Sequence, residues 1–237
     1  MQLATWNLNH RVGSIRYRPE APDAATALNA DVLTFTEFYP QQHEEEFRRK
    51  LCEAGWRHQL ISEETGEVAN RVFMASRVPV SRYPLDPPTF DAQFPANVLP
   101  ALIDSLGIVI VALRVPAYKD GRLLRAAWQW LEQAAGILRK KRAVLLGDFN
   151  VAVGTSSASG KVLQSMLDEG WQRATCTGPT YYGPAGRTGD IDHILATSHR
   201  LLSDAQCVRS KDGFEFCGSP AAISDHAALM CRVEVAQ

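Results

Sequence analysis

The sequence lacks the long apolar segment that a membrane helix requires. None of its apolar runs approaches the roughly 20 residues needed to cross a bilayer. The first residues, Met1 to Asn7, also lack the basic stretch followed by an apolar one that marks a secretory signal. They are typical of a strand instead, so we expect a cytoplasmic protein without a membrane span.

Cysteines are few, odd in number and scattered. None of the five lies in a Cys-x-x-Cys pair: Cys52, Cys176, Cys207, Cys217 and Cys231. This pattern excludes a disulfide framework and a cysteine-based zinc site, and it predicts reduced thiols that are mostly packed. The sequence also has no internal repeat of fixed period and no low-complexity tail.

An excess of positive charge is missing as well. The chain has 25 Lys and Arg residues against 26 Asp and Glu residues, for a formal net charge of -1. Proteins that bind long nucleic acids through phosphates usually show a basic excess or a strong basic stripe. Any polyanion would therefore have to be held locally or through a metal ion.

What is present is enough residues for a sizeable core. The chain has 237 residues, of which 46% are hydrophobic, which is ordinary for a soluble α/β protein. Prolines are dense between Pro79 and Pro100, and they argue against a helix or a central strand there. We predict an extended surface loop in this stretch and one domain over residues 1–237, because the apolar strands on both sides need each other for a core.

Apolar patterning predicts strands and helices along the whole chain. Strands are expected over 3–8, 31–37, 56–61, 71–75, 102–103, 108–113, 143–148, 180–182, 190–196 and 227–235. Helices are expected over 21–30, 41–54, 123–138 and 161–167. In the third helix Trp128 shares a face with leucines, so we expect it in the core.

The most informative stretch is Leu146-Gly147-Asp148-Phe149-Asn150, which ends a buried strand. On an extended backbone, side chains two residues apart project to the same side, so Asp148 and Asn150 should lie together. An acid beside an amide can position a water nucleophile and donate to the oxygen that it attacks. Taken alone, the same residues also fit a turn that closes the strand.

Several other predicted strands end in the same way. The polar residues at their ends are Asn7, Glu37, Asp192, Asp225 and His226. Four carboxylates at one edge would repel each other by several kcal/mol. A divalent cation would remove that repulsion, and an all-oxygen set favours Mg²⁺ or Mn²⁺ over zinc. The remaining histidines that we weighed lie among polar neighbours and are expected at the surface: His10, His43, His58 and His199.

These segments resemble the endonuclease/exonuclease/phosphatase superfamily, which includes exonuclease III-like repair nucleases, DNase I, sphingomyelinases and inositol polyphosphate 5-phosphatases. The matching pieces follow the family's order along almost the whole chain: Thr5-Trp6-Asn7-Leu8-Asn9, Thr34-Phe35-Thr36-Glu37, Leu146 to Asn150, Pro179-Thr180-Tyr181, Ile191 to Leu195 and Ser224-Asp225-His226. The resemblance implies a four-layer α/β/β/α sandwich, in which two mixed sheets pack face to face with helices outside.

The resemblance also implies roles, position by position. Glu37 matches the glutamate that binds the metal ion, with Asn7 beside it and Asp225 completing the metal side. Asp148 matches the aspartate that orients or deprotonates the attacking water. Asn150 matches the amide next to that aspartate, where it would also contact the phosphate.

On the phosphate side, His226 matches the histidine that contacts the phosphate, and Asp192 matches the carboxylate that holds that imidazole. One position departs from the family. Before Val-Pro, where repair nucleases carry tyrosine and many phosphatases carry histidine, this chain has Arg114, whose guanidinium can grip phosphate with two hydrogen bonds. Tyr118 is a weaker candidate for the missing side chain, and Asn70 is a candidate second phosphate contact.

We therefore expect a Mg²⁺- or Mn²⁺-dependent phosphodiesterase that cleaves DNA or RNA by in-line attack of water, acting as a monomer without an obligate protein partner. The alternative is a phosphatase or phosphodiesterase for a small-molecule, nucleotide, inositol or lipid phosphoester, which the neutral charge and Arg114 favour. A non-catalytic binding protein is a third possibility, although no acid of the set is missing. Phe214 and Phe216, before Asp225, could stack on a base or simply pack.

Overall fold

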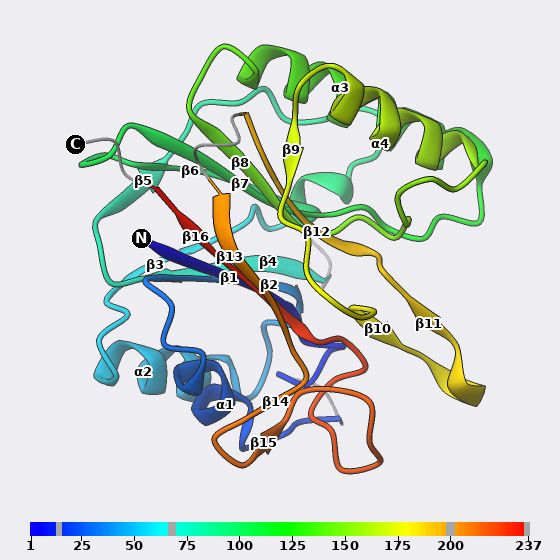
Figure 1. The fold of residues 1–237 in the computed structure, drawn as a ribbon. Coiled ribbons are helices and arrows are strands. Elements are labelled where there is room, and N and C mark those ends of the chain that lie inside the picture. The colour runs from blue at the N-terminus through cyan, green and yellow to red at the C-terminus, as the bar shows by residue number, and fades with distance from the viewer. Residues whose placement is uncertain (13–15, 66–69, 198–201, 235–237) are drawn as a thin grey trace.

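The computed structural model describes residues 1–12, 16–65, 70–197 and 202–234. Two six-stranded sheets lie face to face, with helices on the outer side of each (Figure 1). Within the described ranges, no helix has both the length and the apolar character to cross a membrane.

The first sheet is built around one parallel pair of strands. It has the order β13-β16-β1-β2-β4-β3, and only β1 and β2 run parallel, whereas the other neighbours are antiparallel. The strands are β1 (Gln2–Asn7), β2 (Val32–Phe38), β3 (His58–Ile61), β4 (Arg71–Ser76), β13 (Leu202–Val208) and β16 (Ala228–Val233).

The second sheet repeats this plan. Its order is β5-β6-β7-β8-β12-β9, and only β7 and β8 are parallel. The strands are β5 (Val80–Arg82), β6 (Val98–Ile103), β7 (Ile108–Arg114), β8 (Ala143–Asp148), β9 (Gln172–Arg173) and β12 (Asp192–Ala196). Short connections form two hairpins, β10 (Tyr181–Tyr182) with β11 (Thr188–Gly189) and β14 (Ser210–Lys211) with β15 (Phe214–Glu215), and two 3-10 turns, η1 (Phe94–Asn97) and η2 (Pro184–Gly186).

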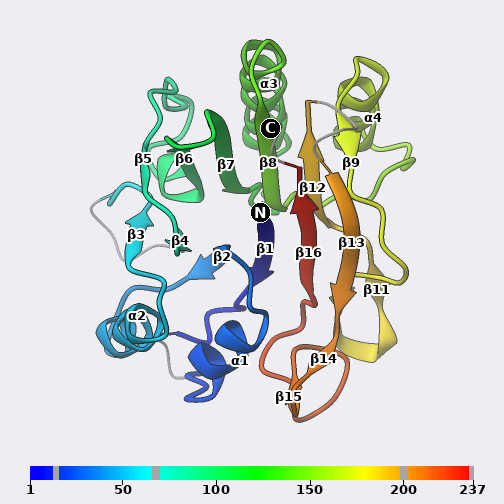
Figure 2. The ribbon, with the colours of Figure 1, turned by 60° about the vertical axis from the view of Figure 1, so that its left-hand side comes forward.

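Helices α1 (Ala21–Ala27) and α2 (Glu44–Glu53) cover the first sheet, and α3 (Gly121–Leu138) and α4 (Ala158–Asp168) cover the second (Figure 2). Helix α3 begins where the Asp120 side chain accepts a hydrogen bond from the Arg122 backbone, as an N-cap residue does. Its buried face includes Trp128, which is 2% exposed, so the predicted core position of this indole is confirmed.

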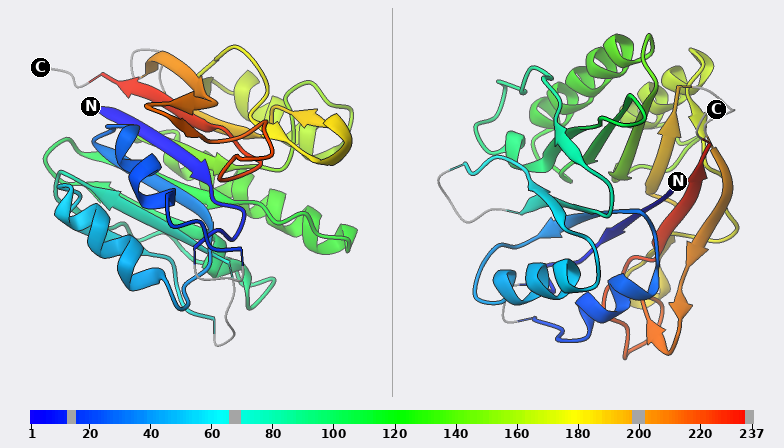
Figure 3. Two further views of the ribbon diagram at one scale, coloured as in Figure 1. Left: turned by 90° about the horizontal axis from the view of Figure 1, so that it is seen from below. Right: turned by 90° about the vertical axis from the view of Figure 1, so that its left-hand side faces the viewer.

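Figure 3 shows the four layers of the fold. Three separate clusters of buried apolar side chains lie between them. Phe47 of α2 packs on Phe35 and Phe73 of the first sheet, and Trp128 of α3 packs on Phe149 beside the second. Between the sheets lie aliphatic side chains, among them Leu3, Val32, Ile110, Leu146 and Ile194. The predicted α/β/β/α sandwich is therefore confirmed.

The proline-rich stretch corrects one expectation, because Pro100 lies in β6, between β5 and β7. In an antiparallel strand the N and C=O of one residue face the same neighbour. The Pro100 carbonyl accepts from the Tyr83 backbone at 3.2 Å, so its nitrogen also faces that side. Since β5 ends at Arg82, the missing N–H falls at the end of the β5–β6 ladder and leaves the pairing of β6 with β7 intact.

The two aromatic residues before Asp225 pack into the fold. Phe216 is fully buried, and its ring centroid lies 4.8 Å from that of Trp6. Phe214 is partly buried against the same apolar layer. Of the two roles considered for Phe214 and Phe216, stacking on a base or packing in the fold, the structure therefore supports packing. All five cysteines are free thiols, of which Cys217 and Cys231 are buried and Cys52 is exposed.

The two parallel pairs lie across from each other, with β1 against β8 and β2 against β7. The close approach of β7 to β8 requires a glycine next to the last residue of β8. Gly147 has φ of 137° and pairs with Leu113, and a Cβ built on it would lie 1.9 Å from the Leu113 carbonyl oxygen.

We predict that Gly147→Ala destabilises the fold by more than about 2 kcal/mol, because the added methyl group meets backbone and the positive φ is strained. Urea unfolding measures the change. Gly136→Ala, in α3 with open space around it, is the matched control and should stabilise by roughly 0.5–1 kcal/mol. Equal unfolding free energies for the two variants would contradict the prediction.

Candidate active site

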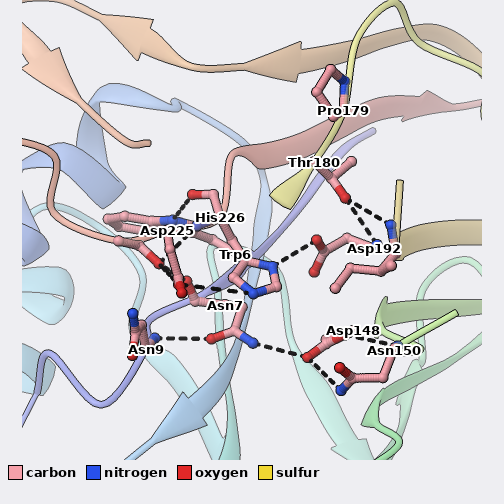
Figure 4. Close-up of polar contacts among 12 residues, drawn as sticks. Trp6, Asn7, Asn9, Asp148, Asn150, Pro179, Thr180, Asp192, Asp225 and His226 are labelled. Carbon is pink, nitrogen blue, oxygen red and sulfur yellow. Dashed lines mark hydrogen bonds and ion pairs between the residues drawn. The ribbon is translucent and has the colours of Figure 1, made fainter. Parts of the chain in front are cut away.

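The predicted site residues converge because some strands end, and their antiparallel neighbours begin, at the same edge of the two sheets. The parallel strands β1, β2, β7 and β8 all run toward this edge. At or next to their last residues they carry Asn7, Glu37, Arg114 and Asp148. An Asn7 Nδ2 bond to Asp148 Oδ2, 3.0 Å long, ties the first sheet to the second (Figure 4). The Arg114 guanidinium spans the sheets in the same way.

Antiparallel neighbours begin where the parallel strands end. Asp192 is the first residue of β12 and pairs with Asp148 of β8. Asp225 and His226 lie just before β16, separated from it by Ala227, and β16 pairs with β1. The amino ends of these strands therefore bring the three remaining residues to the same edge.

Asp148 forms the floor of the site, at 1% exposure. Its Oδ2 accepts from Asn7 and from Asn150 Nδ2, at 3.0 Å each, and its Oδ1 accepts from the Asn150 backbone at 2.9 Å. Burial and the nearby Asp192 carboxylate raise the pKa of Asp148, whereas the charges of His226 and Arg114 oppose that rise. A carboxylate with a raised pKa is a stronger base.

Asn150 meets Asp148 through a turn, which corrects the expected extended geometry. Its φ of 53° is left-handed, and its backbone N–H donates to the Asp148 side chain in an Asx-type turn. The Asn150 amide nitrogen also donates to the Val115 carbonyl at 2.8 Å. Both amide protons are thus used inside the fold, where they hold the Asp148 carboxylate in place.

His226 is buried and held by an acid. Its Nδ1 donates to Asp192 Oδ2 at 2.8 Å, and its backbone N–H donates to Ser224 Oγ at 3.1 Å. Burial alone would lower the pKa of His226, but the charge and hydrogen bond of Asp192, with Asp148 and Asp225 adding to them, raise it to about 9. The imidazole is therefore a cation near neutral pH, with Nε2 left to donate elsewhere.

Glu37 is held by two basic side chains. Arg114 Nε and one terminal nitrogen both lie 2.9 Å from its Oε1, and His10 Nε2 lies 3.0 Å from its Oε2. Burial opposes ionisation, but the hydrogen bond from His10 and the charges of Arg114 and His10 lower the pKa of Glu37 to about 2. His10 was expected at the surface without a role, and the structure corrects this by placing it on Glu37.

Arg114 also faces the other carboxylate of the site. Its Nε lies 3.9 Å from Asp148 Oδ2, and its side chain is 16% exposed. The guanidinium therefore bridges Glu37 and Asp148 and presents little of its surface to solvent. Tyr118, the weaker candidate for this position, donates its hydroxyl to Asp91 instead.

Asp225 is the least compensated carboxylate of the set. Its side chain is 31% exposed, with His226 Nε2 at 3.9 Å from its Oδ1. Ser224 Oγ lies 3.5 Å from the same oxygen. Both distances are long for hydrogen bonds, so the Asp225 carboxylate can still accept a further polar or cationic partner.

The residues fit a hard divalent cation in type, at Glu37 and Asp225. Both offer anionic oxygens, which Mg²⁺ and Mn²⁺ prefer, and Glu37 stays ionised. Over the described ranges, no three His, Cys, Asp or Glu side chains already converge as a metal-binding group. A cation on Glu37 would take the place of His10 or Arg114. Asn7 is less suited, because its Oδ1 already accepts from the Asn9 backbone at 2.9 Å.

The expected repulsion among the four carboxylates is relieved by protein side chains at two of them, Glu37 and Asp192. Glu37 has His10 and Arg114, and Asp192 has His226. From the sequence, we expected a metal ion to serve this purpose. Basic side chains from β7 and from the segments next to β1 and β16 already supply the opposing charge.

Asn70 lies at the same edge but apart from this network. It directly precedes β4, which begins beside Phe38, the neighbour of Glu37. Its Oδ1 is buried and has no hydrogen-bond partner in the described part of the chain.

Three further residues position the site, and we predicted a role for none of them from the sequence. Trp6 Nε1 donates to the His226 carbonyl at 3.0 Å. Thr180 Oγ1 accepts from the Asp192 backbone at 3.0 Å, and the Tyr181 ring lies 5.0 Å from that of His226. In the sequence, only their position inside the family motifs pointed to a role for these three residues. Indole, hydroxyl and phenol groups in strands are more often simply packed in the core.

A family model described as the endonuclease/exonuclease/phosphatase family matches residues 4–226. The chain belongs to this family. Members of the family are phosphoester hydrolases, nucleases and phosphatases, that generally depend on a divalent cation. The comparison with curated proteins finds no match.

Solved structures show the same fold. A 3′ phosphatase from Neisseria bound to a product DNA hairpin is 21% identical, with a TM-score of 0.72 and 99% of each chain covered. A 3′-5′ exonuclease from Neisseria meningitidis is 22% identical, also at 0.72, covering 99% of this chain and all of that one. An AP endonuclease from Archaeoglobus fulgidus gives 21%, 0.72 and the same coverage.

We predict that His226 titrates with a midpoint near pH 9 in NMR spectra recorded with EDTA present. Because its pKa is raised above the usual value of about 6.5, the His226–Asp192 pair stabilises the fold fully below pH ~6.5. That contribution is lost as the pH rises through about 9. The difference in unfolding free energy between the natural protein and His226→Gln should shrink over this window. A midpoint at or below 6.5 would contradict the pairing.

Proposed function

We propose that this protein is a divalent-metal-dependent phosphodiesterase, a nuclease that cleaves DNA or RNA by in-line attack of water. The observation that carries the proposal is the placement of a buried carboxylate, Asp148, beside a cationic imidazole, His226. Asp192 links the two. It pairs with Asp148 on the neighbouring strand and accepts a hydrogen bond from His226. A base and a cation at one edge are what hydrolysis of a phosphodiester requires.

In this proposal Asp148 orients the attacking water and takes its proton. Two donors from Asn150 and one from Asn7 fix the carboxylate, so that it need not reorganise during the reaction. Asn150 therefore acts on Asp148, and its amide protons are not free for the phosphate contact that the resemblance implied.

His226 would donate from Nε2 to a phosphate oxygen and stabilise the negative charge that develops there. Asp192 holds the imidazole in the orientation that leaves Nε2 free and keeps it protonated. Arg114 would contribute a second fixed cation, through guanidinium protons that Glu37 does not use.

Glu37 and Asp225 would hold Mg²⁺ or Mn²⁺ through their carboxylate oxygens. The bound ion would neutralise phosphate charge and lower the pKa of water. Arg114 and His10 would keep Glu37 ionised and oriented before the ion binds.

The choice of a nuclease rests on the structural neighbours, which are a 3′ phosphatase bound to a DNA hairpin, an exonuclease and an AP endonuclease. A second candidate is a phosphatase for a small phosphoester. The neutral net charge favours it, because a long polyanion usually meets a basic surface.

We predict that Asp148→Asn lowers cleavage of single- or double-stranded DNA or RNA by at least about a hundredfold, since it removes the base. Gel assays with labelled oligonucleotides measure the loss, and thermal unfolding checks the fold. Asp168→Asn, at the exposed end of α4, makes the same charge change away from the site and should retain activity. Activity of Asp148→Asn within tenfold of the natural protein would contradict the proposed base.

We also predict that EDTA abolishes cleavage and that added Mg²⁺ or Mn²⁺ restores it. Mn²⁺ binding, followed by electron paramagnetic resonance, should weaken in Glu37→Gln and in Asp225→Asn. Cleavage that continues in EDTA would contradict metal dependence. Release of inorganic phosphate from nucleotides, inositol phosphates or phospholipid headgroups, without any cut in a polynucleotide, would establish the phosphatase instead.

A further inference from the structure

A pocket opens beside the active site, and arginines from two separate segments line it. Its volume is about 580 Å³, and Ser224 and Asp225 form the wall that it shares with the site. Arg11 and Arg18 come from the segment after β1, and Arg187 comes from the β10–β11 hairpin.

Positive charge in this pocket is poorly compensated. Among the lining residues that the structure describes, Asp225 is the only acid, against three arginines. Arg11 Nε is buried without a hydrogen-bond partner in the described part of the chain. Among the described residues, the Arg18 guanidinium pairs with one acid, Glu20, at a long 3.8 Å, and the Arg18 side chain is 35% exposed. Burial and the like charge of Arg18 and Arg16 lower the pKa of Arg11, as expected where cations crowd together.

The hairpin that carries Arg187 is fixed to the active site by backbone hydrogen bonds. Tyr182 N–H donates to the Asp225 carbonyl at 2.7 Å, and Ala227 N–H donates to the Thr180 carbonyl at 2.7 Å. At the hairpin's turn, Gly183 N–H donates to the Arg187 carbonyl at 2.8 Å. The backbone at Arg187 therefore keeps a set position relative to His226 and Asp225.

We propose that Arg11, Arg18 and Arg187 bind a second phosphate group of the substrate, the neighbour of the one that is hydrolysed. Arginine binds phosphate oxygens through paired, charge-assisted hydrogen bonds, and the shared wall at Asp225 makes the two phosphate positions adjacent. This inference rests on the proposed function and narrows its substrate to molecules with at least two phosphates. The second phosphate belongs either to the next phosphodiester of a strand or to a pyrophosphate.

Substrates that differ only in their number of phosphates test this directly. A dinucleotide with one phosphodiester is compared with a trinucleotide, which has two, and with a dinucleoside diphosphate, which has a pyrophosphate. In Arg187→Gln and in Arg11→Gln, the ratio of kcat/KM for a two-phosphate substrate to that for the dinucleotide should fall about tenfold. Arg122→Gln, which removes an 89% exposed arginine of α3, is the matched control and should leave the ratio unchanged.

The substrate that shows the fall identifies the source of the second phosphate, strand or pyrophosphate. An unchanged ratio for both substrates in both arginine variants would overturn the inference.

Binding keeps this test separate from turnover. A labelled single-stranded octanucleotide is titrated in EDTA at several salt concentrations. In each arginine variant, the slope of log K against log salt should fall by about 0.7 for each phosphate that the protein no longer binds. If the natural protein binds in this arginine-dependent way but hydrolyses nothing, the proposed function fails and the second-phosphate site stands. An unchanged slope in both variants would overturn the site.

Discussion

Two parallel strand pairs, one in each sheet, run to the same edge of the molecule, and the candidate site depends on this constraint. Because β1 lies against β8 and β2 against β7, four strand ends meet there. The antiparallel neighbours β12 and β16 start where those strands stop, and they add Asp192, Asp225 and His226. Residues more than 200 positions apart, such as Asn7 and His226, are thereby joined by the pairing of β1 with β16 within the first sheet, and packing of the sheets brings Asp148 to them.

Charge compensation decides what this edge can do. Buried carboxylates are costly unless cations or hydrogen bonds oppose them. Here Arg114 and His10 hold Glu37, and His226 holds Asp192, so two of the four carboxylates at this edge are compensated by protein side chains. The same pairs set the chemistry, because they keep Glu37 ionised and His226 cationic. Arg114, in place of the family's tyrosine or histidine, makes the glutamate more fully paired than an uncharged side chain would. We therefore expect metal binding to compete with Arg114 and His10.

Much of this could be predicted from the sequence, because strand ends are local features. Apolar runs that stop at Asp148, Glu37 or Asn7 mark both the strands and the edge. What escaped prediction depends on tertiary structure. The left-handed turn at Asn150 and the contact of His10 with Glu37 follow from how the segments meet in space. Pro100 in β6 is tolerated only because β5 is short. Edge strand β13 is half polar, so its apolar pattern is too weak to predict.

The net charge of the chain hides how its charges are distributed. Acidic residues gather elsewhere, as in the first turn of α2, where Glu44, Glu45 and Glu46 complement the helix dipole. Beside the site, the pocket residues Arg11, Arg18 and Arg187 face one partly buried acid among the described lining residues, Asp225. A nearly neutral protein can thus present a locally positive pocket over a few residues. An overall charge near zero is therefore compatible with local binding of one or two phosphates.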